Sequence, residues 1–182
     1  MEIIKPNNEG IEKAAKKILN GEIIFIPTDT VYGIAANPYM NKSIKSLYNI
    51  KKRSKNNSLI LLCSNFKMAE KYAVFNKIAY KLKRKFWPGP LTLILKKKNN
   101  IKISKKWIAK NNTLGIRIPD HKVVKKLINK CKIPIFCTSA NISGKKDTGN
   151  IKMVIKNFKK EINAIKCHIV VDGGKDSEGN DM

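Results

Sequence analysis

The spacing of hydrophobic residues along this chain follows two periods, one typical of amphipathic helices and one typical of buried strands. Apolar residues that recur three and four positions apart predict helices over residues 8–19, 41–51, 66–73, 77–86, 122–130 and 150–158. Short apolar runs rich in β-branched residues predict strands over residues 23–26, 59–62, 91–95, 114–118, 133–137 and 168–171. This alternation predicts an α/β fold. Some connections are of hairpin length, so we expect a mixed sheet.

The residues at helix ends and on helix faces refine this picture. Asn8 is expected to cap the first helix, because an asparagine side chain accepts hydrogen bonds from the unpaired amides of a first turn. Gly21 is expected to stop the same helix. In the fourth predicted helix, the spacing of Ala79, Leu82 and Phe86 predicts that these three side chains face the core.

The length and composition are those of one globular domain, with 182 residues of which 42% are hydrophobic. No linker or repeat divides the chain, so residues 1–182 are expected to form a single domain. No run reaches the roughly 18 apolar residues of a membrane helix, and no signal-peptide pattern is present, so we expect a cytoplasmic protein with no membrane partner. Buried free thiols that bind no metal are predicted, because CxxC spacing is lacking, at Cys63, Cys131, Cys137 and Cys167.

The charge balance is unusual. The chain has 38 basic and 13 acidic side chains, a formal net charge of +25. A field of this sign attracts polyanions, and both nucleotides and RNA qualify. The excess is nearly all lysine, however, and it accompanies abundant asparagine and isoleucine, which a codon bias toward A and T also produces. Charge therefore supports an anionic ligand without identifying it.

A polar stretch follows the first predicted strand. The apolar run over residues 23–26 breaks at Pro27, which lacks the amide that a strand ladder needs. Thr28, Thr30 and Tyr32 then supply three hydroxyl groups around one carboxylate. Ligands of open α/β sheets tend to bind at strand ends, which makes this stretch a candidate site. An ordinary polar turn is the alternative.

Cationic and polar side chains stand at the ends of other predicted elements. Lys51 and Arg53 end the second helix and offer a point charge and a planar fork of donors, which suit phosphate or carboxylate oxygens. Ser139 and Asn141 follow a strand two residues apart, so an extended backbone turns both side chains the same way. Arg117, near a strand end, again indicates an anion. The alternatives are a solvated helix end and a capped turn.

Several common catalytic patterns are absent from the sequence. It contains no P-loop, no dinucleotide-binding glycine fingerprint and no acidic pair spaced for two-metal catalysis. Neither His121 nor His168 has a nucleophile–base arrangement around it, so structural roles are expected for both. A site of Lys, Arg, Ser, Thr and Asn side chains favours electrostatic stabilisation and positioning of phosphates over covalent catalysis.

Five short stretches, in their order along the chain, resemble one known family. They are Pro27-Thr28-Asp29-Thr30-Val31-Tyr32-Gly33, Lys51-Lys52-Arg53, Trp87-Pro88-Gly89-Pro90-Leu91-Thr92, Arg117-Ile118-Pro119 and Thr138-Ser139-Ala140-Asn141-Ile142-Ser143-Gly144. None identifies a family by itself. Together, over about residues 21–174, they make the chain similar to the YrdC-like family, the single-domain threonylcarbamoyl-AMP synthases.

The resemblance implies a single YrdC-like domain, a twisted mixed β-sheet flanked by helices with a basic concave pocket. It implies a nucleotidyltransferase that condenses L-threonine, bicarbonate or CO2, and ATP into threonylcarbamoyl-AMP and pyrophosphate. Mg²⁺ is expected with the ATP, and no metal site in the protein itself. It also implies tRNA and a threonylcarbamoyl transferase complex as partners, because that complex transfers the group to an adenosine of tRNA.

The family's functional positions can be carried over where the motifs match. The resemblance implies catalytic roles for Lys51, Arg53, Ser139 and Asn141. It implies that threonine is bound by Thr28, Thr30, Tyr32 and Arg117. It implies that ATP is bound by Arg53, Asn57, Thr113 and Ser139.

The sequence departs from the family's pattern in three places. Ser54 and Ser58 stand where prolines are usual, so a softer loop is expected, and Leu62 stands where some members have a histidine. The chain also stops at Met182, about where the family's Ser-Thr-Val strand begins. We therefore expect either a truncated chain or a member that lacks this edge of the site.

Two other functions stay open on the sequence. A non-catalytic module that binds double-stranded RNA or tRNA, or acts in ribosome maturation, would use the same basic surface. Most aromatic residues, however, fall at core positions, whereas RNA binding favours exposed aromatic side chains for stacking. A carbamoyl-AMP-forming relative is the other alternative, and it is normally one domain of a much longer protein.

Overall fold

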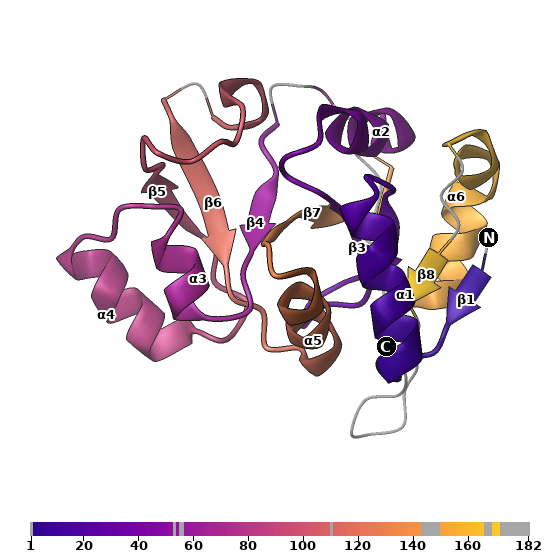
Figure 1. Ribbon diagram of the computed structural model, residues 1–182, viewed down its shortest axis with the longest axis horizontal. Coiled ribbons are helices and arrows are strands. Elements are labelled where there is room, and N and C mark those ends of the chain that lie inside the picture. The colour runs from indigo at the N-terminus through magenta and orange to yellow at the C-terminus, as the bar shows by residue number, and fades with distance from the viewer. Residues whose placement is uncertain are drawn as a thin grey trace.

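Helices and strands follow one another along the chain much as the apolar spacing predicts (Figure 1). The computed structural model describes residues 2–52, 54, 57–109, 111–142, 150–165 and 169–171. Its elements are β1 (Glu2–Ile4), α1 (Asn8–Leu19), β2 (Ile24–Ile26), β3 (Gly33–Ala36), α2 (Asn41–Lys51), β4 (Ile60–Leu62), α3 (Phe66–Glu70), α4 (Lys77–Phe86), β5 (Leu93–Lys96), the 3₁₀ helix η1 (Lys105–Trp107), β6 (Thr113–Arg117), α5 (Lys122–Cys131), β7 (Ile135–Ser139), α6 (Ile151–Ile165) and β8 (Ile169–Val171).

The strands of the described residues form one eight-stranded sheet in the order β1-β8-β2-β3-β7-β4-β6-β5. Strand β8 pairs in parallel with β1 and β2, and β4 pairs in parallel with β6. The other neighbours are antiparallel. The predicted mixed sheet is therefore confirmed. Figure 1 shows α3 and α4 beside β5 at one end of the sheet, with α6, β1 and β8 at the other.

Apolar side chains pack on both faces of the sheet. On one face, α1 and α5 pack together and bury residues such as Ile18 and Leu127 against β2 and β7. On the other face, α2 packs against α6, and the rings of Phe25 and Phe158 lie 5.1 Å apart. Because helices cover both faces, β2 and β3 are buried along their whole length.

Two short strands were not predicted from the sequence, β1 and β3. Strand β3 is Gly-Ile-Ala-Ala, a run of small residues buried on both sides, so it shows neither polar alternation nor β-branched enrichment. A Cβ atom at Gly33 would lie 2.4 Å from the sulfur of Cys137, so this position requires glycine because the neighbouring strand approaches closely. The stretch after Pro27 is thus the turn of a β2–β3 hairpin.

Three predicted helix details were wrong. Asn7, not Asn8, caps α1, since its Oδ1 accepts a hydrogen bond from the amide of Gly10 at 2.8 Å. Helix α6 continues to Ile165, beyond the predicted end at residue 158. Phe86 is 41% exposed because it is the last residue of α4, and the following Trp87 packs against the core instead. Ala79 is buried and Leu82 packs on the core, as predicted.

Cys63, Cys131 and Cys137 are buried free thiols, as predicted, and Cys167 lies outside the described residues. Burial raises the pKa of the Cys131 thiol to about 11 and that of Cys137 to about 12. Among the described residues, none of the helices is long and apolar enough to cross a membrane.

Candidate functional site

A cavity of about 280 Å³ lies over the middle of the sheet, and we call it the first cavity. Its floor consists of apolar atoms from β4 and β7, contributed by Ile60, Leu62 and Cys137. Polar groups surround this floor on several sides. The described residues of the polar rim are Thr28, Thr30, Ser58, Arg117, Thr138 and Ser139.

Strand register explains why residues so distant in sequence meet here. Leu62 lies opposite Arg117 on β6, and Ile60 lies opposite Cys137 on β7. One strand further along, Gly33 lies opposite Ser139. Side chains at paired and alternate positions point to the same face of a sheet. The cavity therefore extends across the sheet face from the end of β7 to the end of β6.

Lys51 lies behind one end of the first cavity. Its side chain, at the C-terminal end of α2, is only 2% exposed. The Nζ atom donates hydrogen bonds to Thr138 Oγ1 at 3.0 Å, Ser139 Oγ at 3.0 Å and Asn141 Oδ1 at 2.8 Å, and to the backbone oxygen of Ser139. One ammonium group thus holds the segment that carries Ser139 and Asn141.

Ser139 and Asn141 lie together, as their two-residue spacing predicts. The Ser139 hydroxyl donates a hydrogen bond to Asn141 Oδ1 at 2.8 Å, and Lys51 contacts both side chains. Ser139 is the last residue of β7 and lies in the strand itself, not in the loop after it. Three of the four residues predicted to be catalytic therefore form one hydrogen-bonded cluster. The fourth, Arg53, lies outside the described residues.

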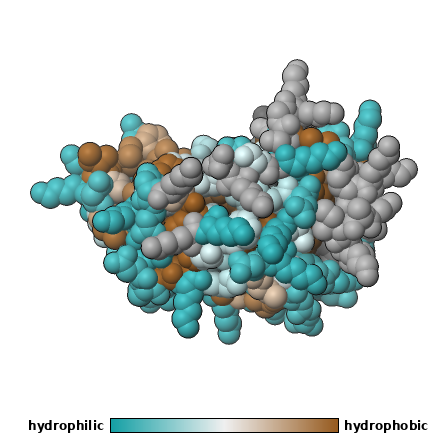
Figure 2. Space-filling view, turned by 90° about the horizontal axis from the view of Figure 1, so that it is seen from above, coloured by the Kyte–Doolittle hydropathy of each residue, from teal (hydrophilic) through white to brown (hydrophobic). Residues whose placement is uncertain are grey.

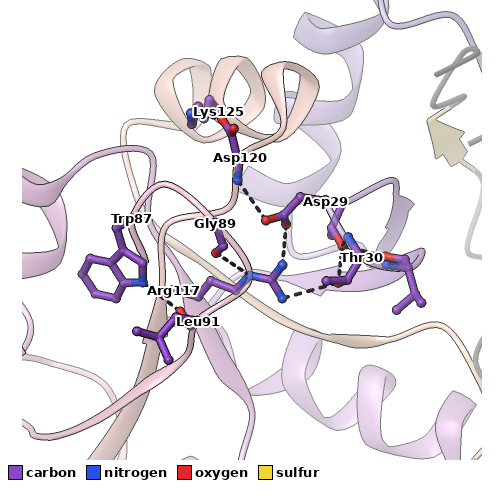
Figure 3. A network of polar contacts seen from close by, with 10 residues as sticks. Asp29, Thr30, Trp87, Gly89, Leu91, Arg117, Asp120 and Lys125 are labelled. Atoms are coloured by element: carbon purple, nitrogen blue, oxygen red, sulfur yellow. Dashed lines mark hydrogen bonds and ion pairs between the residues drawn. The ribbon is translucent and has the colours of Figure 1, made fainter. Parts of the chain in front are cut away.

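Arg117 lies at the other end of the cavity, where two turns hold its guanidinium group (Figure 3). Its Nη2 forms an ion pair with Asp29 Oδ1 at 2.5 Å, and its Nε donates to the backbone oxygen of Gly89 at 3.2 Å. A longer contact of 3.4 Å joins Nη1 to Thr30 Oγ1. The side chains of Arg117 and Asp29 are only 11% and 9% exposed. The planar donor fork is thereby fixed in direction before any ligand binds.

Asp29 is the site residue to which the sequence analysis gave no role. Its second oxygen accepts a hydrogen bond from the Asp120 amide at 3.0 Å, so the carboxylate ties the β2–β3 turn to the segment after β6. A signal for this role existed, because Asp29 is the one carboxylate in a hydroxyl-rich turn and Arg117 is a cation near a strand end. Nothing in the sequence shows, however, that these two segments meet.

The two threonines of the β2–β3 turn both line the cavity. Thr28 Oγ1 donates to the backbone oxygen of Val31 at 2.7 Å, and it lies 3.2 Å from Thr30 Oγ1. The backbone amide of Thr30 also approaches Thr28 Oγ1. Thr28 therefore stabilises the turn, whereas Thr30 lies between Thr28 and the Arg117 guanidinium group. Thr30 is the better placed of the two to contact a ligand beside Arg117.

Other predicted site residues do not line the first cavity. Tyr32 is 1% exposed and packs within the core. Thr113 begins β6, at the opposite end of the strand from Arg117, and its hydroxyl donates to Asn111 Oδ1 at 2.7 Å. Asn57 lies in the loop after α2, where its backbone oxygen accepts the Tyr48 hydroxyl at 2.8 Å. The roles assigned to these three residues stay predictions.

His121 immediately precedes α5 and is 7% exposed. Burial lowers the pKa of its imidazole below the ordinary value, although Asp29 and Asp120 oppose this effect. Its Nδ1 has no hydrogen-bond partner among the described residues. This burial fits the predicted structural role, and His168 lies outside the described part of the chain. Within that part, His, Cys, Asp and Glu side chains form no group of three or more that could hold a metal ion.

Comparisons with known proteins agree on one family. Residues 16–181 match the Sua5/YciO/YrdC family, whose description is telomere recombination. A putative threonylcarbamoyl-AMP synthase of Methanocaldococcus jannaschii is 40% identical over 165 residues, which are 91% of this chain and 74% of that protein. The threonylcarbamoyl-AMP synthase of Bacillus subtilis is 34% identical over 172 residues, which are 94% of this chain and 48% of the relative.

A solved structure agrees with these matches. The crystal structure of P. abyssi Sua5 complexed with L-threonine superposes with a TM-score of 0.87 at 32% sequence identity. The match covers 96% of this chain and 51% of that protein. This chain therefore spans about half the length of the Bacillus and Pyrococcus relatives.

Proposed function

The chain belongs to the Sua5/YciO/YrdC family, and from this membership we propose that it is a threonylcarbamoyl-AMP synthase. The reaction condenses L-threonine, bicarbonate or CO2, and ATP, and releases pyrophosphate. One observation carries the proposal. The first cavity has an oriented arginine with a threonine hydroxyl at one end and Ser139 at the other, where Lys51 holds both Ser139 and the adjacent Asn141.

The Arg117 end suits the amino acid. A guanidinium group whose direction is already fixed binds a carboxylate with little loss of side-chain entropy. Thr30 lies beside it and offers a hydroxyl group that can pair with the hydroxyl of threonine. The apolar floor formed by Ile60 and Leu62 suits the threonine methyl group. Tyr32 stays a predicted contributor to this site.

The Lys51 end suits the phosphates. The ammonium group fixes the positions of the Ser139 and Asn141 side chains before ATP binds, and it adds a positive charge behind them that attracts phosphate oxygens. Arg53, Asn57 and Thr113 stay predicted contributors to ATP binding. Mg²⁺ would arrive bound to the ATP phosphates as part of the substrate, because the described residues provide no carboxylate cage for it.

The reaction requires the protein to position the two reactants, and it does not require covalent catalysis by a side chain. The threonine amine adds to the carbon of CO2 and loses a proton, which gives a carbamate. A carbamate oxygen attacks the α-phosphorus of ATP, the bond from the α-phosphorus to its bridging oxygen breaks, and pyrophosphate leaves. Both reactants are anions, so the cationic groups at the two ends of the cavity reduce their mutual repulsion.

The proposed partners follow from the product. A threonylcarbamoyl transferase complex would consume the adenylate and modify tRNA. The competing proposal, an RNA-binding module without catalysis, has less support, because an amino-acid-sized cavity with an oriented arginine is not needed to bind a phosphate backbone.

A product assay tests this function. The protein is incubated with ATP, Mg²⁺, bicarbonate and L-threonine, and pyrophosphate and threonylcarbamoyl-AMP are quantified, the latter by mass spectrometry. We expect both products, and neither when threonine is omitted. A folded protein that binds RNA but forms no adenylate would contradict the proposal and favour the RNA-binding alternative.

A further inference from the structure

A second cavity of about 340 Å³ lies behind the wall of the first and has no described lining residue in common with it. Ile118 lines the second cavity, whereas its neighbours Arg117 and Pro119 line the first. The turn at residues 87–91 completes the wall, because the Gly89 amide donates to the Ile118 oxygen at 2.9 Å and the Gly89 oxygen accepts from Arg117. Figure 3 shows Trp87 and Lys125 on elements flanking this wall.

Cationic groups from two different helices converge on the second cavity. Lys83 and Arg84 come from α4 and Lys125 from α5, and none of the described residues that line the cavity is acidic. Within the described chain, no carboxylate lies at ion-pair distance from Lys83 or Arg84. The Lys83 ammonium instead lies 3.5 Å from the centre of the Phe66 ring.

Stabilisation of the α4 C-terminus explains part of this charge, since Lys83 and Arg84 lie in the last turn of that helix. It does not explain why Lys125 of α5 faces the same cavity. Lys125 pairs with Asp120 at 2.9 Å, but that carboxylate is 69% exposed and the pair is therefore weak. Three like charges around one concavity repel one another, and a bound anion relieves this repulsion.

Neutral polar groups complete a set of donors. The Ser64 side chain is 7% exposed, and its Oγ accepts a hydrogen bond from Asn65 Nδ2 at 3.2 Å. The Ser64 hydroxyl proton has no acceptor among the described residues, although the residue is buried at the cavity. A hydroxyl donor, a guanidinium fork and ammonium groups are the combination that binds phosphate oxygens.

We propose that the second cavity is an anion site that takes inorganic phosphate or pyrophosphate, separate from the first cavity. Residues 117–119 separate the two cavities, and the turn that lines the second cavity through Trp87 and Pro88 also carries the Gly89 oxygen that holds Arg117. An anion bound in the second cavity therefore acts on Arg117 through the backbone of Gly89. Occupancy of the second cavity is therefore coupled to carboxylate binding at Arg117, and the coupling is reciprocal.

Trp87 provides a local readout. It lines the second cavity, and its indole N–H donates to the Leu91 oxygen at 2.7 Å, so its NMR signal reports on the turn. The chain has two tryptophans, and a Trp87→Phe variant assigns their indole signals. Titration with pyrophosphate, and separately with phosphate, should shift the Trp87 signal saturably. Sodium chloride at equal ionic strength should not. The two anion arms distinguish a site for one phosphoryl group from a site for two.

Matched variants locate the effect. Lys83→Gln combined with Arg84→Gln should weaken anion affinity at Trp87 by about tenfold or more, since charge-assisted hydrogen bonds are lost. Lys81→Gln combined with Lys85→Gln removes the same charge from the same helix outside the cavity and should leave affinity unchanged. Lys125→Gln, on the other helix, gives an independent test if the first pair folds poorly. A shift that persists in both cavity variants, or that disappears in the control, overturns the proposal.

The coupling has its own measurement. The affinity for L-threonine, determined by calorimetry with and without phosphate, should change by about threefold or more in the wild type and in the Lys81/Lys85 control. The same change should be absent when Lys83 and Arg84 are replaced. An equal change in all three proteins would mean that phosphate acts in the first cavity, and would overturn the coupling.

Discussion

Lys51 and Arg117 are the two described cations at opposite ends of the first cavity, and the fold holds them in different ways. The Lys51 ammonium group contacts hydroxyl, carbonyl and amide oxygens that all belong to residues 138–141. The Arg117 guanidinium group contacts two separate segments, the β2–β3 turn through Asp29 and Thr30 and the turn at residues 87–91 through Gly89. One cation organises a single segment, whereas the other connects the turns that form the wall.

The two cations are therefore expected to act on a ligand in different ways. Lys51 acts on a ligand mainly through the serine and asparagine that it orients. Arg117 lines the cavity itself, and its direction depends on a carboxylate from another turn. A largely buried ion pair contributes little net stability, but breaking it leaves an uncompensated charge. Changes at the Lys51 end should therefore affect turnover most, and changes at the Arg117 end should affect threonine binding most.

Lys51→Met should have the largest effect. It removes the donor shared by Thr138, Ser139 and Asn141, so we expect pyrophosphate release to fall by ~10²-fold or more. The free energy of unfolding should fall by about 1–3 kcal/mol, because buried oxygens lose a partner. Turnover assays and urea titrations measure the two effects. Lys45→Met, at an exposed position of the same helix, is the control, and full turnover by folded Lys51→Met protein would contradict the comparison.

Asp29→Ala should raise the KM for threonine by about tenfold, equivalent to roughly 1.4 kcal/mol of binding free energy. The substitution leaves Arg117 without its ion pair and frees the Asp120 amide, so the guanidinium direction is no longer fixed. The KM for ATP should change much less, because Lys51 and its partners are untouched. Steady-state kinetics with each substrate varied separately measures both. An equal rise in the KM for threonine and the KM for ATP would mean that the two ends of the cavity are not independent.

Thr30→Val tests amino-acid selectivity at the Arg117 end. A site that hydrogen-bonds a substrate hydroxyl rejects analogues without it, so the wild type should prefer threonine over valine by ~10²-fold or more. The isosteric valine at position 30 should reduce this preference several-fold while it leaves the fold intact. Competition assays with both amino acids give the ratio. Thr113→Val, at the far end of β6, is the matched control. An equal change in the threonine-to-valine preference of this control would mean that Thr30 does not determine the selectivity.

Cys137 gives the smallest expected effect and a test of the local dielectric between the two cations. Burial raises the pKa of its thiol to about 12, although Lys51 and Arg117 act in the opposite direction. The thiol ionises in the unfolded chain from about pH 9, whereas it stays neutral in the folded protein. The contribution of the neutral Cys137 thiol to the free energy of unfolding is therefore complete below pH 9, and it declines as the pH rises toward 12.

The stability difference between wild type and Cys137→Ala, measured by urea unfolding at pH 8 and again at pH 10.5, should shrink at the higher pH. Alkylation of the native protein by iodoacetamide at pH 8 should leave Cys137 unmodified, because the protonated thiol is a poor nucleophile. Rapid alkylation of Cys137 would indicate that the cavity floor is more hydrated than its burial indicates.

The sequence by itself determined the elements and part of the site, because both depend on short-range patterns. Strands β2, β4, β6 and β7 follow from apolar runs, and α2 follows from apolar residues at helical spacing. The two-residue spacing of Ser139 and Asn141 correctly predicts that their side chains lie together, although the chain bends after Ser139 and the contact is a hydrogen bond between the two side chains. The departure at Leu62 also matters for the site, since this side chain forms part of the cavity floor.

The tertiary structure alone decided which of these groups meet. Lys51 contacts residues 87 to 90 positions away, and Arg117 contacts Asp29 across 88 positions. Backbone preferences act over a few residues, whereas strand order and register depend on how all apolar faces pack at once. For the same reason β3, a strand of small residues without a local signal, became visible only between β2 and β7. The ion pair between Arg117 and Asp29 likewise depends on the tertiary structure, because only the folded sheet brings their two segments to the same end of the cavity.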